Sequence, residues 1–512
     1  MRAVRRALRE EGWRVVGFAI AGFAMTLLQS VAYYRLAGNT FPERAVFGYS
    51  LSLEAAVNAV LSAPPVRPDT VAGYVELRAF GPLAIIFAGW AAVSATAFAS
   101  PHIISRAAGF AVSAIVAAAA ACVGVVIGVA SGGDSVSGLA VAEAGVLLVA
   151  LAIACYAICL LVAQLTPAAT IVAGSLVLTL FFVNSLSRIF AELAAARWLS
   201  PFRYYDLSTP LPPGGRFDVG GFAMLLAIAA IGTALAGVVS TRRVGAAPVV
   251  RRTAYEPSRV PLLGFPIMRN LYPQRVAFAA WGVAFAALGI VLVAAARRSM
   301  QDLLSLPHLL PGLPQYIFVF YAHVLGQTWF DASVLVCTAL VFAFVAGWSA
   351  EDSDGRLEAE LSAPYSRSAV ILERLAALGF ATAVLAALGG LAVGFTSRAV
   401  NLELDSTRLA DACILLVVFS VVLGAAGSLL SSWLPRAAPA LFGAYVLASY
   451  LDDQIGGALG LPGWAQNISA FRLIGTPLAN GVDARSLALM LLLALAGLGS
   501  SILVMQRRDV GA

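Results

Sequence analysis

The sequence predicts an all-α polytopic membrane protein with about 12 transmembrane helices in two pseudo-symmetric six-helix bundles. Composition, the number of long apolar runs and an internal repeat lead to this fold class. Of the 512 residues, 60% are hydrophobic and 12% are charged, whereas soluble domains are about 45–50% apolar and about 25% charged. A soluble globular fold would expose too much apolar surface to water, which excludes that class.

The apolar runs have the length that a lipid bilayer requires. A hydrocarbon core of about 30 Å is crossed by roughly 20 apolar residues in a helix, and the chain contains about six such runs in each half. The expected spans lie near 13–33, 74–97, 107–130, 138–163, 167–190 and 219–240 in the first half, and near 275–296, 327–350, 368–395, 409–431, 437–451 and 485–505 in the second.

Short motifs recur about half a chain apart. Gly89-Trp90-Ala91-Ala92 has its counterpart in Gly347-Trp348-Ser349-Ala350, and Thr209-Pro210-Leu211 in Thr476-Pro477-Leu478. Parallel repeats in membrane proteins form bundles related by an axis along the membrane normal. We therefore expect a first six-span domain over 1–240, a cytoplasmic Arg/Pro-rich linker over 241–274 and a second six-span domain over 275–512. Two halves around one axis favour a transport pathway.

Arginine distribution predicts the orientation. The N-terminal tail, the linker and the C-terminus are rich in arginine, and an even number of spans places all three on one side. Positive loops lie in the cytoplasm, so both termini are expected there. Residues 1–11 are also expected to form a short amphipathic helix on the inner surface. Moderately apolar stretches at 191–218 and 452–484 are expected to form short helices at the outer side.

Several chemistries are excluded or disfavoured by the residue types. All 33 basic residues are arginine, so the chain cannot hold the lysine of a P-loop or of a protein kinase. The sequence predicts no catalytic residues, no metal site, no cofactor in this chain and no nucleic-acid partner. The cysteines and histidines lack the spacing of a metal site; they are Cys122, Cys155, Cys159, Cys337, Cys413, His102, His308 and His323.

The strongest local signal follows the eighth expected span. Residues 351–367 read EDSDGRLEAELSAPYSR, and Leu357 and Leu361 lie four residues apart beside acidic positions. Amphipathic helices on the inner membrane surface normally carry arginine, to meet anionic lipid. An acidic helix is better suited to a basic or polar groove on a soluble protein partner. A solvated charged loop is the alternative interpretation.

This segment resembles a known family. The acidic pair, Gly355-Arg356-Leu357-Glu358, Leu361-Ser362, Pro364 and Ser366-Arg367 follow the second span of a six-span unit. They resemble the coupling helix of type-2 ABC exporter membrane subunits, and residues 199–205 (LSPFRYY) resemble the sequence before that family's last span. Two six-span units in one chain resemble the fused permeases of actinobacterial multidrug and polyketide-antibiotic (tetronasin-type) exporters.

The resemblance implies a permease subunit of an ABC-type exporter in the bacterial cytoplasmic (inner) membrane. Such a subunit would move an amphipathic or hydrophobic, drug-like molecule outward. A separate nucleotide-binding ATPase subunit, expected in two copies, would carry the ATP and Mg. The implied contacts with the ATPase are Glu351, Asp352, Asp354, Gly355, Arg356, Leu357, Glu358, Leu361 and Pro364, and Ser100, Pro101, His102 and Arg106 in the first half.

The two halves differ at these loops. The first-half loop keeps Ser100-Pro101 and Ser105-Arg106 but lacks the acidic pair and the Gly-Arg-Leu-Glu sequence. We therefore expect asymmetric docking, with the second half as the stronger contact. Glu373 and Arg374, at the start of the ninth span, are candidates to pair with the acidic segment.

Two other classes remain as alternatives. A proton-coupled secondary transporter of the major-facilitator kind shares the two six-span halves, but residues 98–106 do not match its loop pattern. A membrane-embedded lipid-linked transferase would need a carboxylate or histidine cluster. Acids within or near spans are functional candidates by default, although side chains near span ends can reach water. Glu143, Asp331, Asp411, Asp452 and Asp453 are such acids, and the sequence assigns them no role.

Overall fold

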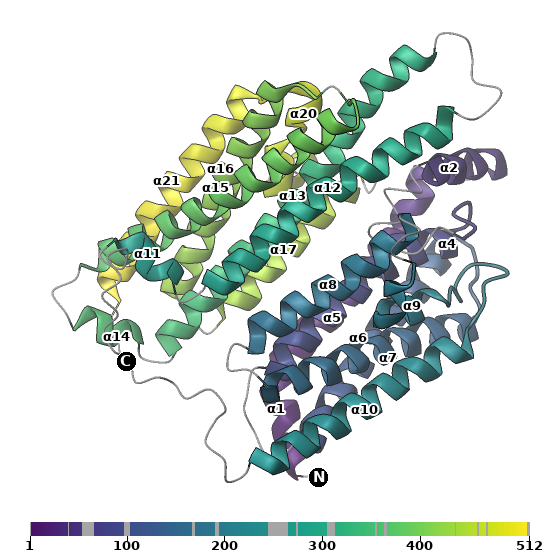
Figure 1. Cartoon of the computed structure of the whole chain (residues 1–512), viewed down its shortest axis with the longest axis horizontal. Coiled ribbons are helices and arrows are strands. Elements are labelled where there is room, and N and C mark those ends of the chain that lie inside the picture. Colours follow the sequence, from purple (N-terminus) through teal and green to yellow (C-terminus); the bar gives the residue numbers. More distant parts are fainter. Residues whose placement is uncertain are drawn as a thin grey trace. The chain divides into compact units, whose positions relative to one another are not determined.

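The computed structural model describes helices almost throughout (Figure 1). The residues that it describes are 2–38, 40–53, 66–96, 103–165, 169–189, 194–243, 265–272, 275–304, 313–353, 356–362, 366–402, 404–435, 437–457, 460–466 and 469–508. Within these ranges, β pairing is limited to one isolated bridge between Thr209 and Arg216. The chain divides into two compact units, Met1–Ser258 and Arg259–Ala512, and the division lies inside the expected linker.

The first unit consists of long helices joined by short helical turns. They are α1 (Arg2–Leu36), α2 (Phe41–Leu53), α4 (Val71–Val75), the π-helical turn η1 (Glu76–Phe80), α5 (Gly81–Thr96), α6 (Ile103–Ser131), α7 (Gly138–Leu165), α8 (Ala169–Ile189), the 3₁₀ turn η3 (Ala196–Leu199), α9 (Pro201–Asp206) and α10 (Val219–Arg243).

The second unit begins with a short helix and then repeats the arrangement of long helices. It contains α11 (Pro266–Leu271), α12 (Arg275–Leu304), α13 (Leu313–Ser353), α14 (Arg356–Leu361), α15 (Arg367–Ala399), α16 (Ser406–Trp433), α17 (Ala438–Ile455), α18 (Gly463–Gln466), α19 (Ala470–Ile474), α20 (Pro477–Asn480) and α21 (Ala484–Arg507).

Every expected span coincides with a helix of the structure. In the described part of the chain, ten helices are long and apolar enough to cross a membrane. The other two expected spans coincide with α8, whose apolar part Val172–Arg188 is shorter, and with α17, which carries Asp452 and Asp453 at its end. The prediction of an all-α polytopic membrane protein is confirmed.

Both units pair their long helices in the same way. The first span packs on the third, as α1 on α6 and α12 on α15, and the fourth packs on the sixth, as α7 on α10 and α16 on α21. The second span also contacts the fourth and the fifth in each unit. The sequence repeat therefore corresponds to a repeated helix arrangement.

Glycine allows the same close approach between the fourth and sixth spans of each unit. A Cβ placed on Gly232 of α10 would lie 3.0 Å from the Cβ of Ala157 on α7, and one on Gly497 of α21 would lie 3.0 Å from the Cβ of Ala425 on α16. Small residues let helix backbones approach closely in membranes, where packing replaces the hydrophobic effect as the driving force.

The repeated tryptophans lie in the apolar interiors of the units. Trp90 is buried, with its ring stacked on Phe18 at 4.4 Å and edge-on to Phe110 at 5.0 Å. Trp348 is buried as well and makes an edge contact with Phe344. Each tryptophan packs the last turns of a second span, α5 or α13, into its unit. The loop in which ATPase contacts are expected follows directly.

The segments that follow α8 and α17 form short helices, as expected, and share a serine cap. Ser200 accepts the amide N–H of Phe202 at the start of α9 and donates to the carbonyl of Leu180 at 2.8 Å. Ser469 accepts the amide of Arg472 in α19 and donates to the carbonyl of Ser449 at 2.8 Å. Each hydroxyl thus ties a capping helix to the span that precedes it.

One expectation needs correction, and one acid needs notice. The N-terminal segment is not a separate surface helix, because α1 continues without a break from Arg2 to Leu36. Glu76 lies within the candidate span Val71–Thr96, an acid that the sequence did not single out. It begins the π-helical turn η1 and accepts the amide N–H of Leu211 at 3.2 Å.

Candidate functional site

The acidic segment lies at one end of the second unit, where α13, α14, α15 and α21 meet. Helix α13 ends at Ser353 and the short helix α14 follows; α15 begins at Arg367, capped by Ser366, whose hydroxyl accepts the amide of Ala369. The segment is therefore a helical turn between two long spans, as the pattern of Leu357 and Leu361 indicates.

The first two acids of the segment form ion pairs within the unit. Glu351 accepts a hydrogen bond from Arg374 of α15 at 2.7 Å. Asp352 accepts one from Arg508, just beyond the end of α21, at 2.9 Å. The expected pairing of Arg374 with the segment is confirmed. From the sequence alone, the arginines of the C-terminus, Arg508 among them, indicate only the membrane orientation. Together the two pairs connect the end of α13 to both neighbouring spans.

Helix α14 has one apolar and one acidic face. Leu357 is 2% exposed, and Leu361 is partly buried. Glu358 and Glu360 are exposed, so their carboxylates stay in contact with solvent while Leu357 holds the helix against the unit. The acids that anchor the segment, Glu351 and Asp352, thus precede in sequence the exposed acids Glu358 and Glu360.

Two further arginines fix the surroundings of the segment. Arg367, at the start of α15, donates to the carbonyls of Met505, Gln506 and Arg508 at 3.0, 3.1 and 2.7 Å. It satisfies carbonyls that the end of a helix leaves without intrahelical partners. Arg269 of α11 pairs with Glu373 of α15 at 2.9 Å, which attaches the end of the linker to the same span.

Sequence reasoning missed the contribution of the C-terminus and of the linker to this site. The only signal was charge: Arg269 and Arg508 lie on the side to which the acidic segment was also assigned. Opposite charges on one side of a bundle can pair, but the partners lie 104 and 156 residues apart. A single sequence does not specify contacts at that separation.

Other predicted contact residues are described only in part. Asp354, Gly355, Pro364, Ser100, Pro101 and His102 lie outside the described residues, and Arg356 is described for its backbone alone. Arg106 of α6 donates to the carbonyl of Ser94 at 3.0 Å. Ser94 follows Trp90 by four residues, as Asp352 follows Trp348, so the two units differ at this position as well.

The acids of the spans do not converge on these residues. Asp331 accepts a hydrogen bond from Gln327 at 2.6 Å within α13. The two carboxylate oxygens of Asp452 are buried without a hydrogen-bond partner, and Asp453 is exposed. Among the described residues, no group of three or more His, Cys, Asp or Glu is arranged to hold a metal ion.

A protein-family model matches the second unit. Residues 266–504 match the family model described as "Multidrug efflux system permease Rv1217c, C-terminal domain". The match covers nearly all of the second unit, including the acidic segment. A search of curated proteins found none that matches the chain. The second unit is thus similar to a domain of an efflux permease, which indicates a transport subunit rather than an enzyme.

Proposed function

We propose that the chain is the membrane permease subunit of an ABC-type exporter. It moves an amphipathic or hydrophobic small molecule outward and is driven by a separate ATPase subunit. The match over residues 266–504 supports the efflux permease. The lack of lysine supports a separate ATPase, because a P-loop in this chain would need that residue.

The observation that carries the proposal is the division of the acidic segment. Glu351 and Asp352 are engaged with Arg374 and Arg508, while Glu358 and Glu360 are exposed on α14. A free-standing solvated loop would not need two ion pairs and a buried leucine to hold it. A docking helix needs both an anchored side and a side that faces its partner.

The anchoring contacts also provide a route for movement. A partner that pushes on α14 acts on the end of α13, and the pairs with Arg374 and Arg508 pass the displacement to α15 and α21. Arg367 adds a second link between α15 and the end of α21. Nucleotide-driven closure of an ATPase on this segment would therefore tilt several spans together.

Co-purification with a candidate ATPase subunit, such as a P-loop protein encoded beside the gene, tests the proposal. The complex is reconstituted in vesicles, and ATP hydrolysis and outward flux of a fluorescent amphipathic dye are measured together. The double variant Glu358→Gln/Glu360→Gln should uncouple flux from hydrolysis and weaken docking. The control is Asp405→Asn, which removes an exposed acid at the start of α16 but can keep its helix cap, and it should behave as the unmodified chain.

Two outcomes would overturn the proposal. One is that no nucleotide-binding protein associates with the chain, or that one associates but the double variant leaves docking and flux unchanged. The other is a flux that continues without ATP and stops when a protonophore collapses the proton gradient, which would favour the secondary transporter.

A further inference from the structure

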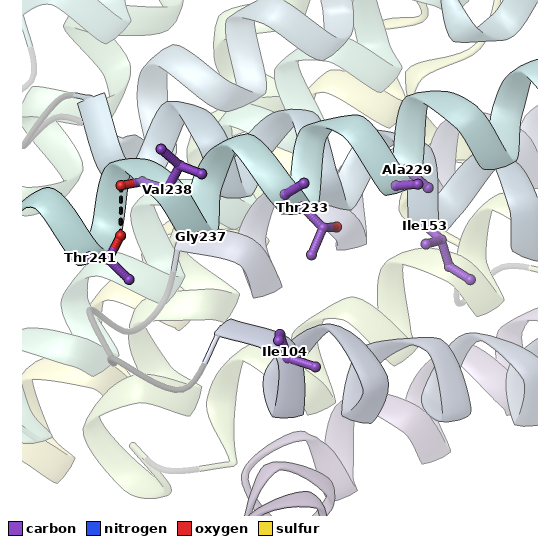
Figure 2. A pocket seen from close by; sticks show the side chains of 9 residues that line it. Ile104, Ile153, Ala229, Thr233, Gly237, Val238 and Thr241 are labelled. Carbon is purple, nitrogen blue, oxygen red and sulfur yellow. Dashed lines mark hydrogen bonds between the residues drawn. The ribbon is translucent and has the colours of Figure 1, made fainter.

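The first unit has an open apolar groove along its last span. The groove has a volume of about 640 Å³, within the roughly 300–1,000 Å³ of small-molecule sites. One side is a face of α10, and the other sides are Ile104 of α6 and Ile153 of α7. Figure 2 shows Ile104 across the groove from Thr233 and Gly237 of α10.

Small side chains on α10 create the hollow. Its lining there is Ala229, Ala230, Thr233, Ala234, Gly237, Val238 and Thr241, at the spacing of one helix face. A Cβ on Gly237 would have no atom within 4 Å, so the space beside this residue is open. On another face of the same stretch, Gly232 approaches Ala157 closely; α10 therefore packs tightly on α7 with that face and leaves the groove beside α6.

The described lining consists of apolar side chains and glycine, apart from two threonines. Its side-chain hydroxyls are those of Thr233 and Thr241, and Thr241 donates to the carbonyl of Val238 at 2.9 Å. Among the residues that the structure describes, none that lines the groove is charged. Ile104 and Val238 are 80% and 49% exposed, although both belong to candidate spans. Around spans the surrounding medium is lipid, so hydrocarbon chains are what such a surface meets.

The length and position of the groove match one leaflet of a bilayer. From Ala229 to Thr241, α10 rises about 18 Å at about 1.5 Å per residue, close to half of a hydrocarbon core of about 30 Å. Thr241 ends the candidate span and Ile104 lies at the start of α6, so the groove reaches one membrane surface. Arg242 and Arg243 follow directly in the sequence, at the end that arginine distribution assigns to the cytoplasm.

We propose that this groove binds one acyl chain of an anionic phospholipid from the cytoplasmic leaflet. The acyl chain lies along the small-residue face of α10, and the phosphate headgroup lies at the level of Arg242 and Arg243. Basic residues next to a span attract anionic headgroups. A cargo molecule is the competing occupant, but the described lining offers only the hydroxyls of Thr233 and Thr241, and no charge, to select one ligand over another.

Filling the groove tests the proposal, because Gly237→Trp adds a side chain where a Cβ meets no neighbour. Gly499→Trp is the matched control: this glycine lies on the exposed span α21, and its Cβ would also have no atom within 4 Å. The chain is placed in nanodiscs of phosphatidylcholine and phosphatidylglycerol with a trace of spin-labelled phosphatidylglycerol and, in a parallel sample, of spin-labelled phosphatidylcholine. The motionally restricted lipid is measured by electron paramagnetic resonance, and retained phospholipid by native mass spectrometry.

We expect Gly237→Trp to lose one retained phospholipid per chain and Gly499→Trp to lose none. Arg242→Gln/Arg243→Gln should keep an acyl chain but lose the preference for phosphatidylglycerol over phosphatidylcholine. The proposal is overturned if Gly237→Trp retains as much lipid as the unmodified chain, or if the unmodified chain restricts both lipids equally. Displacement of the restricted lipid by the fluorescent dye would identify a cargo site instead. These readouts need no ATPase, so they are independent of the proposed function.

Discussion

Arg374 donates to Glu351 across 2.7 Å and thereby joins the start of α15 to the end of α13. The two side chains are buried unequally: that of Arg374 is 6% exposed and that of Glu351 is 36% exposed. Removing one partner therefore has a different effect from removing the other. Loss of the acid leaves a buried guanidinium without its counter-charge, whereas loss of the arginine leaves an acid that water can reach.

The first prediction follows from this asymmetry. Glu351→Ala should lower the free energy of unfolding by about 1–3 kcal/mol, the penalty of a buried charged group without its partner. Glu358→Ala, on the exposed side of α14, should change it by less than about 0.5 kcal/mol. Thermal unfolding of both variants in the same detergent makes the comparison. Equal losses for the two variants would show that Glu351 does not anchor the segment.

The second prediction concerns salt. If Glu358 and Glu360 meet a basic surface on the ATPase, association should slow as ionic strength rises, because exposed charges are screened beyond about 8 Å at physiological salt. Removing charges at the edge of an interface mainly changes the association rate and its salt dependence. Glu358→Gln/Glu360→Gln should thus flatten the plot of association rate against salt, measured by surface plasmon resonance. Parallel plots for the variant and the unmodified chain would contradict the expectation.

A third prediction uses the repeated glycines. Gly232→Val and Gly497→Val should each destabilise their unit by about 1–3 kcal/mol, as overpacking does, because the added Cβ alone would meet alanine at 3.0 Å. Gly237→Val introduces the same side chain on α10 where a Cβ has no neighbour, and it should be tolerated. Unfolding in detergent ranks the three variants. A cost for Gly237→Val as large as that for Gly232→Val would argue against close helix approach as the cause.

The fold could be predicted because hydropathy and the repeat are local or periodic features. Apolar runs marked every span, and the Trp90 and Trp348 motifs marked the equivalent second spans. The pairs of Asp352 with Arg508 and of Arg269 with Glu373 could not be predicted, since they depend on how α15, α21 and α11 pack. The role of Glu76 could not be predicted for a similar reason: its partner is the amide of Leu211, 135 residues away.

The fourth prediction is a dependence on pH at the start of α21. Asp483 caps this helix by accepting the amide of Ser486 at 3.0 Å and its hydroxyl at 2.8 Å. The hydrogen bonds from Ser486 hold the pKa of Asp483 below its usual value of 3.8. A lowered pKa in the folded state adds stability above the usual pKa, and this stability is lost as pH falls through the folded value. Asp483→Asn should therefore lose stability at neutral pH but show a weaker dependence on pH below about 4. Unfolding across that range in detergent tests both parts, and an unchanged acid dependence in the variant would assign it to other groups.

The fifth prediction treats the two capping serines as equivalents. Ser200 and Ser469 are both buried. Each hydroxyl accepts an amide N–H at the start of a short helix and donates to a carbonyl of the preceding span. Alanine at either position removes the cap and leaves a carbonyl of that span without its hydroxyl donor, so each variant should lose about 1–2 kcal/mol. Because the serines belong to separate units, the losses should add in Ser200→Ala/Ser469→Ala, as is usual for distant sites. Ser486→Ala is the control, because it removes a hydroxyl at a helix start from a residue that is only half-buried; it should cost less than either single variant. The expectation would be contradicted if the double variant lost no more unfolding free energy than one single variant. The two serines would then not stabilise their units independently.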